Sequence, residues 1–192
     1  MYFQKAREYV LNRLQQELPL NLYYHGIHHT LDVCRAVEQL ASCENVSGED
    51  LVLLRTAALY HDIGFVERYR NNEPLASRIA RESLAQFGYS PDQINTICLI
   101  IMATQIPQRP VTHLEMIMCD ADLDYLGRED FYEISETLYR EWREFGIIGS
   151  LEEWNCKQLH FLQQHQYFTK TAKAQREALK LKHFSELQRL LQ

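Results

Sequence analysis

The apolar residues of the chain recur at spacings of three and four along most of its length. This is the period of an amphipathic α-helix, and no segment shows the strict alternation of a half-buried β-strand. The N-terminal segment is typical, because one helical face would carry Phe3, Ala6, Val10, Leu14 and Leu18 before Pro19 ends the pattern. We therefore expect an all-α fold.

Capping and turn residues divide the rest of the chain into further helices. Ser90 is followed by proline and Ser150 stands three residues before Glu153, and both patterns favour a helix start. Gly64 and Gly88 stand where helices would stop. The predicted apolar faces centre on Val33 and Val37, Leu54 and Ala58, Ile79 and Leu84, Ile97 and Ile101, Leu138 and Trp142, Phe161 and Leu162, and Ala178, Leu181, Phe184 and Leu187. These signals predict a bundle of about eight to nine helices.

Length and composition favour one domain. The chain has 192 residues, of which 46% are hydrophobic, so that it can bury a sizeable core over residues 1–192. A net charge of −6 disfavours a nucleic-acid partner. The five cysteines are scattered without Cys-x-x-Cys spacing, as is typical of reduced cytosolic thiols. Since no leader pattern or long apolar stretch is present, we expect a cytoplasmic protein with no membrane partner.

The first residues that could bind a metal or take part in a reaction lie in a histidine-rich segment before the second predicted helix. It contains His25, His28 and His29, and in a helix that begins near His25 the first and third of these share a face. The next predicted helix ends in the pair His61-Asp62, and the helical period turns His61 toward the core. A histidine that faces the core needs a partner.

Three carboxylates, Asp120, Asp122 and Asp124, alternate in a later apolar helix. Residues two apart cannot face one way on a helix, so at most one or two of them can point inward. Imidazole and carboxylate groups together bind divalent ions such as Mn, Fe, Co, Zn or Mg, and two His with two Asp would leave positions open for water. The predicted ligands are His29, His61, Asp62 and one of Asp120 and Asp122.

A histidine, an adjacent His-Asp pair and a later aspartate in an apolar helix resemble the HD-domain superfamily of metal-dependent phosphohydrolases, which are all-α proteins. The resemblance covers about residues 22–127, and we expect the helices of residues 130–192 to pack on this core. The segment Tyr24-His25-x-x-x-His29 is also similar to the metal motif of cyclic nucleotide phosphodiesterases. The resemblance implies an HD-domain-like helical bundle.

The resemblance also assigns roles to individual residues. It implies that His29, His61 and Asp62 bind the metal and that His25 protonates the leaving group. For the last ligand, the doublet Ala121-Asp122 matches the family, whereas Asp120 has the more typical apolar residues before it. Both aspartates stay open here, and Asp122 is favoured.

The implied activity is metal-assisted hydrolysis of a phosphate ester or anhydride of a small metabolite, with a nucleotide or cyclic nucleotide as the substrate class. Arg68, Arg70 or Arg128 could neutralise phosphate charge. A regulatory module that binds metal and nucleotide without turnover is a second hypothesis. An oxygen-using di-iron enzyme of the same fold is a third, but it needs ligands that the segment around Glu73 does not supply. The sequence does not predict the oligomeric state.

Other polar and aromatic residues have plainer interpretations. His28 is expected at the surface, and Asp32 is expected either to orient a ligand imidazole or to be solvated. His165 is expected in the core or at the rim of the site. We interpret Trp142 and Trp154 as core residues.

Overall fold

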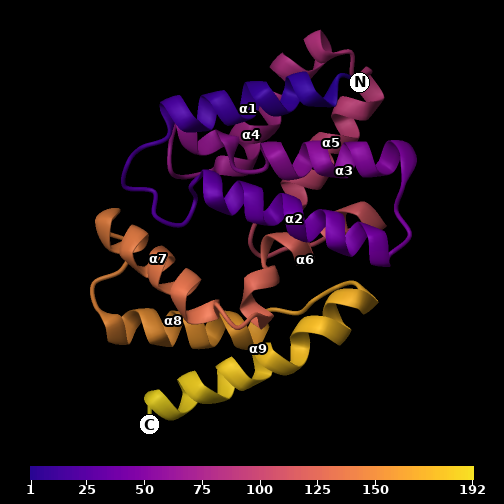
Figure 1. Cartoon of the computed structure of the whole chain (residues 1–192). Helices are drawn as coiled ribbons and strands as arrows, with labels where there is room; N and C mark the ends of the chain where they lie inside the picture. The colour runs from indigo at the N-terminus through magenta and orange to yellow at the C-terminus, as the bar shows by residue number, and fades with distance from the viewer.

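The computed structural model describes residues 1–192, and every regular element in it is a helix (Figure 1). This confirms the all-α prediction and the expected number of helices. The nine α-helices are α1 (Phe3–Glu17), α2 (Ile27–Cys43), α3 (Gly48–Tyr60), α4 (Asn72–Leu84), α5 (Pro91–Ala103), α6 (His113–Asp122), α7 (Phe131–Glu144), α8 (Leu151–Gln164) and α9 (Lys170–Leu190). Three short 3-10 helices separate some of them: η1 (Ile63–Val66), η2 (Ala85–Phe87) and η3 (Asp124–Gly127). None of these helices combines the length and the apolar character that a bilayer-spanning segment needs.

The helix starts follow from local hydrogen bonding. The Ser90 hydroxyl accepts from the backbone N–H of Gln93, whose side chain accepts from the Ser90 N–H, so that α5 opens with a capping box. The Ser150 hydroxyl caps α8 through the Glu153 N–H. Thr112 and Glu115 form a second capping box at the start of α6. These bonds satisfy donors that have no partner within the helix.

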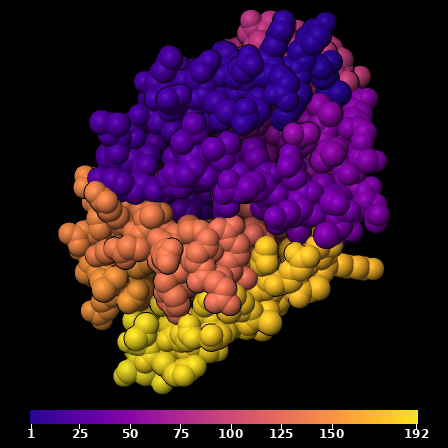
Figure 2. Space-filling view, in the orientation of Figure 1, coloured from indigo at the N-terminus to yellow at the C-terminus, as the bar shows by residue number.

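The helices pack around two hydrophobic clusters. The larger one lies among α1 to α6 and includes Val37, Leu54 and Ile101. The smaller one joins η3 with the C-terminal helices and includes Phe131 and Leu187. In Figure 1, α6 descends from the N-terminal helices toward α7, α8 and α9, and Figure 2 shows these later helices covering one end of the molecule.

A charged network ties η3 to α2 and α9. The Arg128 guanidinium donates to Asp32 at 2.8 Å and to Asp130 at 2.7 Å. Arg176 on α9 donates to the buried carboxylate of Asp124 at 2.6 Å. Arg128 is thus engaged in holding the fold together, and Asp32 pairs with a guanidinium instead of orienting a ligand or remaining solvated. Neither residue takes the role that the sequence suggested.

The prediction for the last helix was right for Leu187, which is buried, but wrong for Leu181. Leu181 is 53% exposed, whereas Lys180 and His183 are buried. The Lys180 ammonium donates to the carbonyl of His165 at 2.8 Å, and His183 Nδ1 donates to the carbonyl of Leu126 at 3.1 Å. These buried acceptors lie outside the helix, so the hydropathy pattern of α9 alone did not reveal them.

Candidate active site and metal centre

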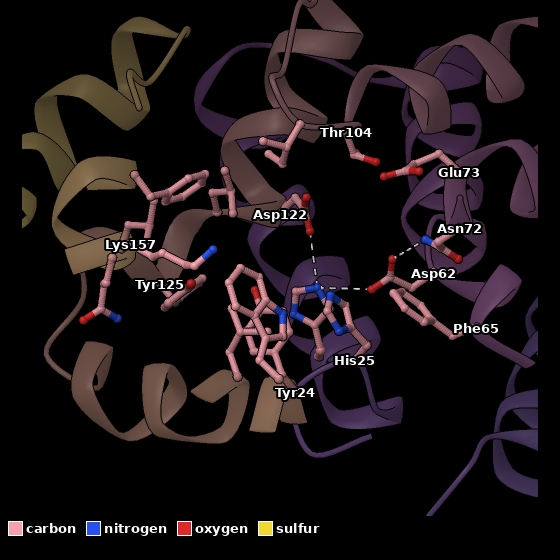
Figure 3. A pocket seen from close by; sticks show the side chains of 18 of the residues that line it. Tyr24, His25, Asp62, Phe65, Asn72, Glu73, Thr104, Asp122, Tyr125 and Lys157 are labelled. Atoms are coloured by element: carbon pink, nitrogen blue, oxygen red, sulfur yellow. Dashed lines mark hydrogen bonds and ion pairs between the residues drawn. The ribbon is translucent and has the colours of Figure 1, made fainter. Parts of the chain in front are cut away.

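Four side chains from three separate parts of the chain converge beneath a pocket. His29 lies in the first turn of α2, His61 and Asp62 link α3 to η1, and Asp122 is the last residue of α6. One ligand atom from each of His29, His61 and Asp122 lies within 4.8 Å of the other two. Figure 3 shows the carboxylates of Asp62 and Asp122 approaching one imidazole nitrogen from two sides. That nitrogen is His29 Nε2.

The distances among these groups match the edges of a coordination polyhedron. The Nε2 atoms of His29 and His61 are 3.4 Å apart. Asp62 Oδ2 lies 3.1 Å from His61 Nε2 and 3.5 Å from His29 Nε2, and Asp122 Oδ1 lies 3.3 Å from His29 Nε2. Bonds of about 2.1 Å to one ion give ligand separations of about 3.0 Å in an octahedron and about 3.4 Å in a tetrahedron. His29, His61 and Asp122 therefore fit a single divalent ion, and Asp62 Oδ2 lies beside both imidazoles as a further oxygen donor.

The hydrogen bonding of His61 and Asp62 supports the same conclusion. His61 Nδ1 donates to the carbonyl of Ala58 at 2.8 Å, which directs the Nε2 lone pair toward the cluster. Asp62 Oδ2 is buried and has no hydrogen-bond partner, although it lies 3.1 Å from that nitrogen. Two lone pairs at this distance repel each other unless a cation or a proton balances them. A divalent ion would satisfy both atoms.

Asp120 is separate from this group, although the sequence left it open as a ligand. Its side chain is fully buried, and its two oxygens accept the backbone N–H groups of Phe168 and Thr169 at 2.8 Å each. Asp120 thereby fixes the connection that leads into α9. The helical period turns Asp122, two residues later, to the other side and into the cluster.

Asp62 is positioned by a residue that the sequence analysis did not single out. The Asn72 amide donates to Asp62 Oδ1 at 2.7 Å and to the carbonyl of His61 at 2.9 Å. This contact requires η1 to lie against the start of α4. Gly64 permits it, because a Cβ at this position would lie 2.4 Å from the Asn72 carbonyl oxygen. Gly64 was predicted to end the helix, but α3 already ends at Tyr60.

The charged groups of the cluster change one another's pKa. Burial opposes protonation of His61, but the carboxylates of Asp62 and Asp122 outweigh it and raise the pKa of the imidazole. Burial likewise opposes ionisation of Asp122, but His29 and His61 lower its pKa. The cluster thus attracts positive charge. A metal ion would take the place of the imidazolium proton, since metal ligands bind in their deprotonated forms.

His25 lies beside the cluster but not in the helix that was expected to carry it. Helix α2 begins at Ile27 with Gly26 as its N-cap, so His25 precedes the helix and the argument from a shared helical face was wrong. Its ring centroid is nevertheless 6.1 Å from that of His29. The ring also stacks on Phe65 with centroids 4.3 Å apart.

The position of His25 is fixed by Glu141, a fully buried carboxylate on α7. His25 Nδ1 donates to Glu141, and the backbone N–H groups of Tyr24 and His25 donate to the same carboxylate at 2.8 and 3.0 Å. The Tyr69 hydroxyl donates to it at 2.9 Å. Because Nδ1 is occupied, Nε2 is the nitrogen of His25 that is free to exchange a proton with a ligand.

The two partners change each other's pKa. Burial acts to lower the pKa of His25, but the Glu141 hydrogen bond and the nearby carboxylates raise it overall. Burial acts to raise the pKa of Glu141, but its bonds to His25 and to the backbone amides lower it overall. The pair therefore favours a protonated imidazole beside an ionised carboxylate.

A pocket of about 400 Å³ lies over the cluster, between η1 and α4 on one side and α7 and α8 on the other. Trp142 and Trp154 line it. Trp154 is buried, as the interpretation as a core residue requires, whereas Trp142 is only half-buried. His28, Arg68, Arg70, Arg128 and His165 do not line the pocket. The one lysine or arginine that lines the pocket is instead Lys157 on α8.

The comparisons with known proteins now bear on this site. A protein-family model described as the HD domain matches residues 26–124, which is more than half of the chain. The chain belongs to the HD-domain family. Comparison with curated proteins and with solved structures gave no match. The HD domain so defined contains His29, His61, Asp62 and Asp122, whereas Glu141 and the α8 wall of the pocket lie outside it.

Glu141 and Asn72 are the residues of this HD-domain site that sequence reasoning missed. Glu141 follows Leu138 by three residues and therefore falls on the apolar face of its helix, where an isolated carboxylate is unusual. That mismatch is a signal that could have identified it. Asn72 gave no comparable signal, because it stood in a charged connection among other polar residues.

Proposed function

We propose that the protein is a metal-dependent phosphohydrolase that cleaves a phosphate ester or anhydride of a small metabolite, with nucleotides and cyclic nucleotides as the first substrates to test. The observation that carries the proposal is the convergence of two imidazoles and two carboxylates at the floor of a pocket that His25 also lines. Membership in the HD-domain family supports it, because these domains bind divalent metals.

In this proposal His29, His61, Asp62 and Asp122 hold the ion. When bound, a divalent ion supplies Lewis acidity, which favours the ionisation of water and polarises a phosphoryl oxygen. The protein fixes two of the four groups in advance, since Asn72 holds Asp62 and the Ala58 carbonyl holds His61. Such fixed groups lose little freedom when a ligand binds.

His25 supplies the proton in the same reaction. The oxygen of water forms a bond to phosphorus, the bond from phosphorus to the leaving oxygen breaks, and the proton on His25 Nε2 passes to that departing oxygen. The proton that the water releases restores the imidazolium. Glu141 holds the imidazole by Nδ1 and favours its charged form. Proton donation of this kind typically contributes about 10²–10⁴-fold to a rate.

The first experiment measures the metal content of the purified protein by elemental analysis, together with phosphate release from a panel of phosphomonoesters, phosphodiesters, nucleotides and cyclic nucleotides. We expect about one equivalent of a divalent transition metal and turnover of at least one phosphate compound, with loss of both after chelation. Metal without any turnover would favour the regulatory module instead. Absence of metal affinity would contradict the proposal.

Glu141→Gln should move the pH dependence of hydrolysis. The Glu141 carboxylate raises the pKa of His25, so removal of its charge lowers that pKa. Since His25 donates as the protonated imidazole, activity is lost as the pH rises through its pKa. We therefore expect the alkaline limb of the kcat profile to shift to lower pH, measured by initial rates with metal held saturating.

Tyr69→Phe is the matched control for this shift. It removes one hydrogen bond to the same carboxylate but keeps the charge, and it keeps the ring that stacks on Phe145 with centroids 3.9 Å apart. Its alkaline limb should stay close to that of the wild type. An unchanged limb in Glu141→Gln would mean that His25 is not the group whose titration limits the rate.

A further inference from the structure

The pocket joins two chemically different regions. Its floor is the polar cluster with His25, and Asn72 and Glu73 continue this polar side toward α4 (Figure 3). Its opposite wall belongs to α7 and α8, where Leu138, Trp142, Trp154 and Phe161 line it together with Leu123, Tyr125 and Leu126 from η3 and the residue before it. The rest of the α8 lining is polar and consists of Lys157, Gln158, His160 and Gln164. A ligand with one polar end and one apolar end matches this division.

The charges around the pocket limit how many phosphates can enter. Lys157 is the only lysine or arginine among the lining residues, and it enters from the α8 side (Figure 3). Three carboxylates line the pocket: Asp62 and Asp122, which one divalent ion would neutralise, and Glu73, whose pKa is raised by burial. Each further phosphate on a substrate adds negative charge for which the lining offers no second lysine or arginine, and such charge is costly away from bulk water.

The apolar wall limits the size and polarity of the part of the ligand that carries no phosphate. Trp154 is 5% exposed and packs edge-to-face on Trp142 with centroids 5.4 Å apart, so the two indoles form one rigid surface. A cavity of about 400 Å³ has the size at which a pocket takes a small organic ligand. Rigid aromatic walls favour an apolar or flat group, because its burial removes apolar surface from water on both sides.

We propose that the site selects a phosphate monoester, with a single phosphate at the cluster and a bulky apolar leaving group held between η3 and the wall formed by Trp142, Trp154 and Phe161. This inference rests on the proposed function and narrows its substrate class. Lys157 is then a specificity-determining residue that balances the charge of the one phosphate. Water is the only co-reactant, and the products are inorganic phosphate and the free alcohol.

The test compares alkyl phosphates that differ only in chain length. Ethyl, butyl and hexyl phosphate release alkoxides of closely similar basicity, so differences in kcat/KM report binding by the apolar wall. We expect a rise of about three- to fourfold per methylene and of about 100-fold from ethyl to hexyl phosphate. For the charge, AMP should exceed ATP in kcat/KM by about 10- to 100-fold.

Two variants of α8 test whether the preference for longer alkyl chains arises from the apolar wall. Phe161→Ala removes part of the lining and should reduce the ratio of kcat/KM for hexyl over ethyl phosphate by about 5- to 10-fold. Leu151→Ala on the same helix truncates an apolar side chain that is 54% exposed and does not line the pocket, so its ratio should equal that of the wild type. The ratio is independent of the folded fraction, and Phe161→Leu replaces the alanine variant if that one fails to fold.

A binding measurement separates this inference from the proposed function. The chain has two tryptophans and both line the pocket, so the non-hydrolysable hexylphosphonate should change the intrinsic fluorescence of the protein as purified at concentrations where ethylphosphonate does not. If hexylphosphonate changes the fluorescence but no ester is hydrolysed, the proposed function fails and the inferred ligand class is retained. If kcat/KM does not depend on chain length, or if ATP and AMP have equal kcat/KM, the inference is overturned and the proposed phosphohydrolase function is retained.

Discussion

Asp122→Asn will lose the bound divalent metal and with it at least about 100-fold in phosphohydrolase activity. Replacement of residues that only support a metal ligand costs about 10- to 100-fold in affinity or activity, so loss of a ligand itself should reach or exceed the upper end of that range. Asp122 Oδ1 is 3.3 Å from His29 Nε2 and 3.5 Å from His61 Nε2, at the position that an ion would share with both imidazoles. Elemental analysis and phosphate release on the same sample measure the two losses.

Asp120→Asn is the control, because it makes the same chemical change two residues away. Asp120 accepts the N–H groups of Phe168 and Thr169, so its substitution weakens the connection to α9. We expect a lower free energy of unfolding, by about 1–3 kcal/mol, with the metal content retained. If Asp120→Asn lost the metal and Asp122→Asn kept it, the assignment of the ligand would be reversed.

His25→Ala will keep the metal and lose turnover. Its imidazole lines the pocket and is held by Glu141 through Nδ1, which leaves Nε2 to donate a proton to the leaving oxygen. The kcat should fall by about 10²–10⁴-fold, as is typical when a general acid is removed. The loss should shrink for esters with acidic leaving groups, such as nitrophenyl phosphate, because a stable phenolate needs no proton to depart.

The neighbouring histidine provides the comparison for His25. His28 does not line the pocket, and His28→Ala should leave both the metal content and kcat close to the wild-type values. By contrast, His61→Ala should lose metal and turnover together, because His61 Nε2 lies within 3.5 Å of Asp62 and Asp122. Retention of full activity in His25→Ala would contradict its role as the proton donor.

Much of the fold follows from short-range signals in the sequence. Helix starts at Ser90 and Ser150 depend on hydrogen bonds between residues three apart, and such bonds form wherever those residues occur in this order. Apolar periodicity similarly predicted helices throughout the chain. It failed to predict part of the buried face of α9, because the acceptors that permit Lys180 and His183 to be buried come from other segments.

The candidate ligands also follow from the sequence, because metal chemistry restricts which side chains can serve. His29, His61, Asp62 and one later aspartate were selected on residue type and resemblance alone. The choice between Asp122 and Asp120 depended on the backbone N–H groups of Phe168 and Thr169, which bind Asp120 from 48 and 49 residues further along the chain. Only the folded structure shows that these groups lie beside Asp120. The role of Glu141 depends similarly on a contact with His25 over a separation of 116 residues.

The sequence by itself therefore determined the all-α class, the helix starts after Ser90 and Ser150, and the set of residues able to hold a metal. Each of these depends on residue type and on neighbours within about one helical turn. Tertiary structure decided which aspartate joins the cluster, how His25 is held before α2, and that Trp142 and Trp154 line a pocket. These outcomes depend on the approach of segments that are distant in the chain, and helical periodicity contains no information about that approach.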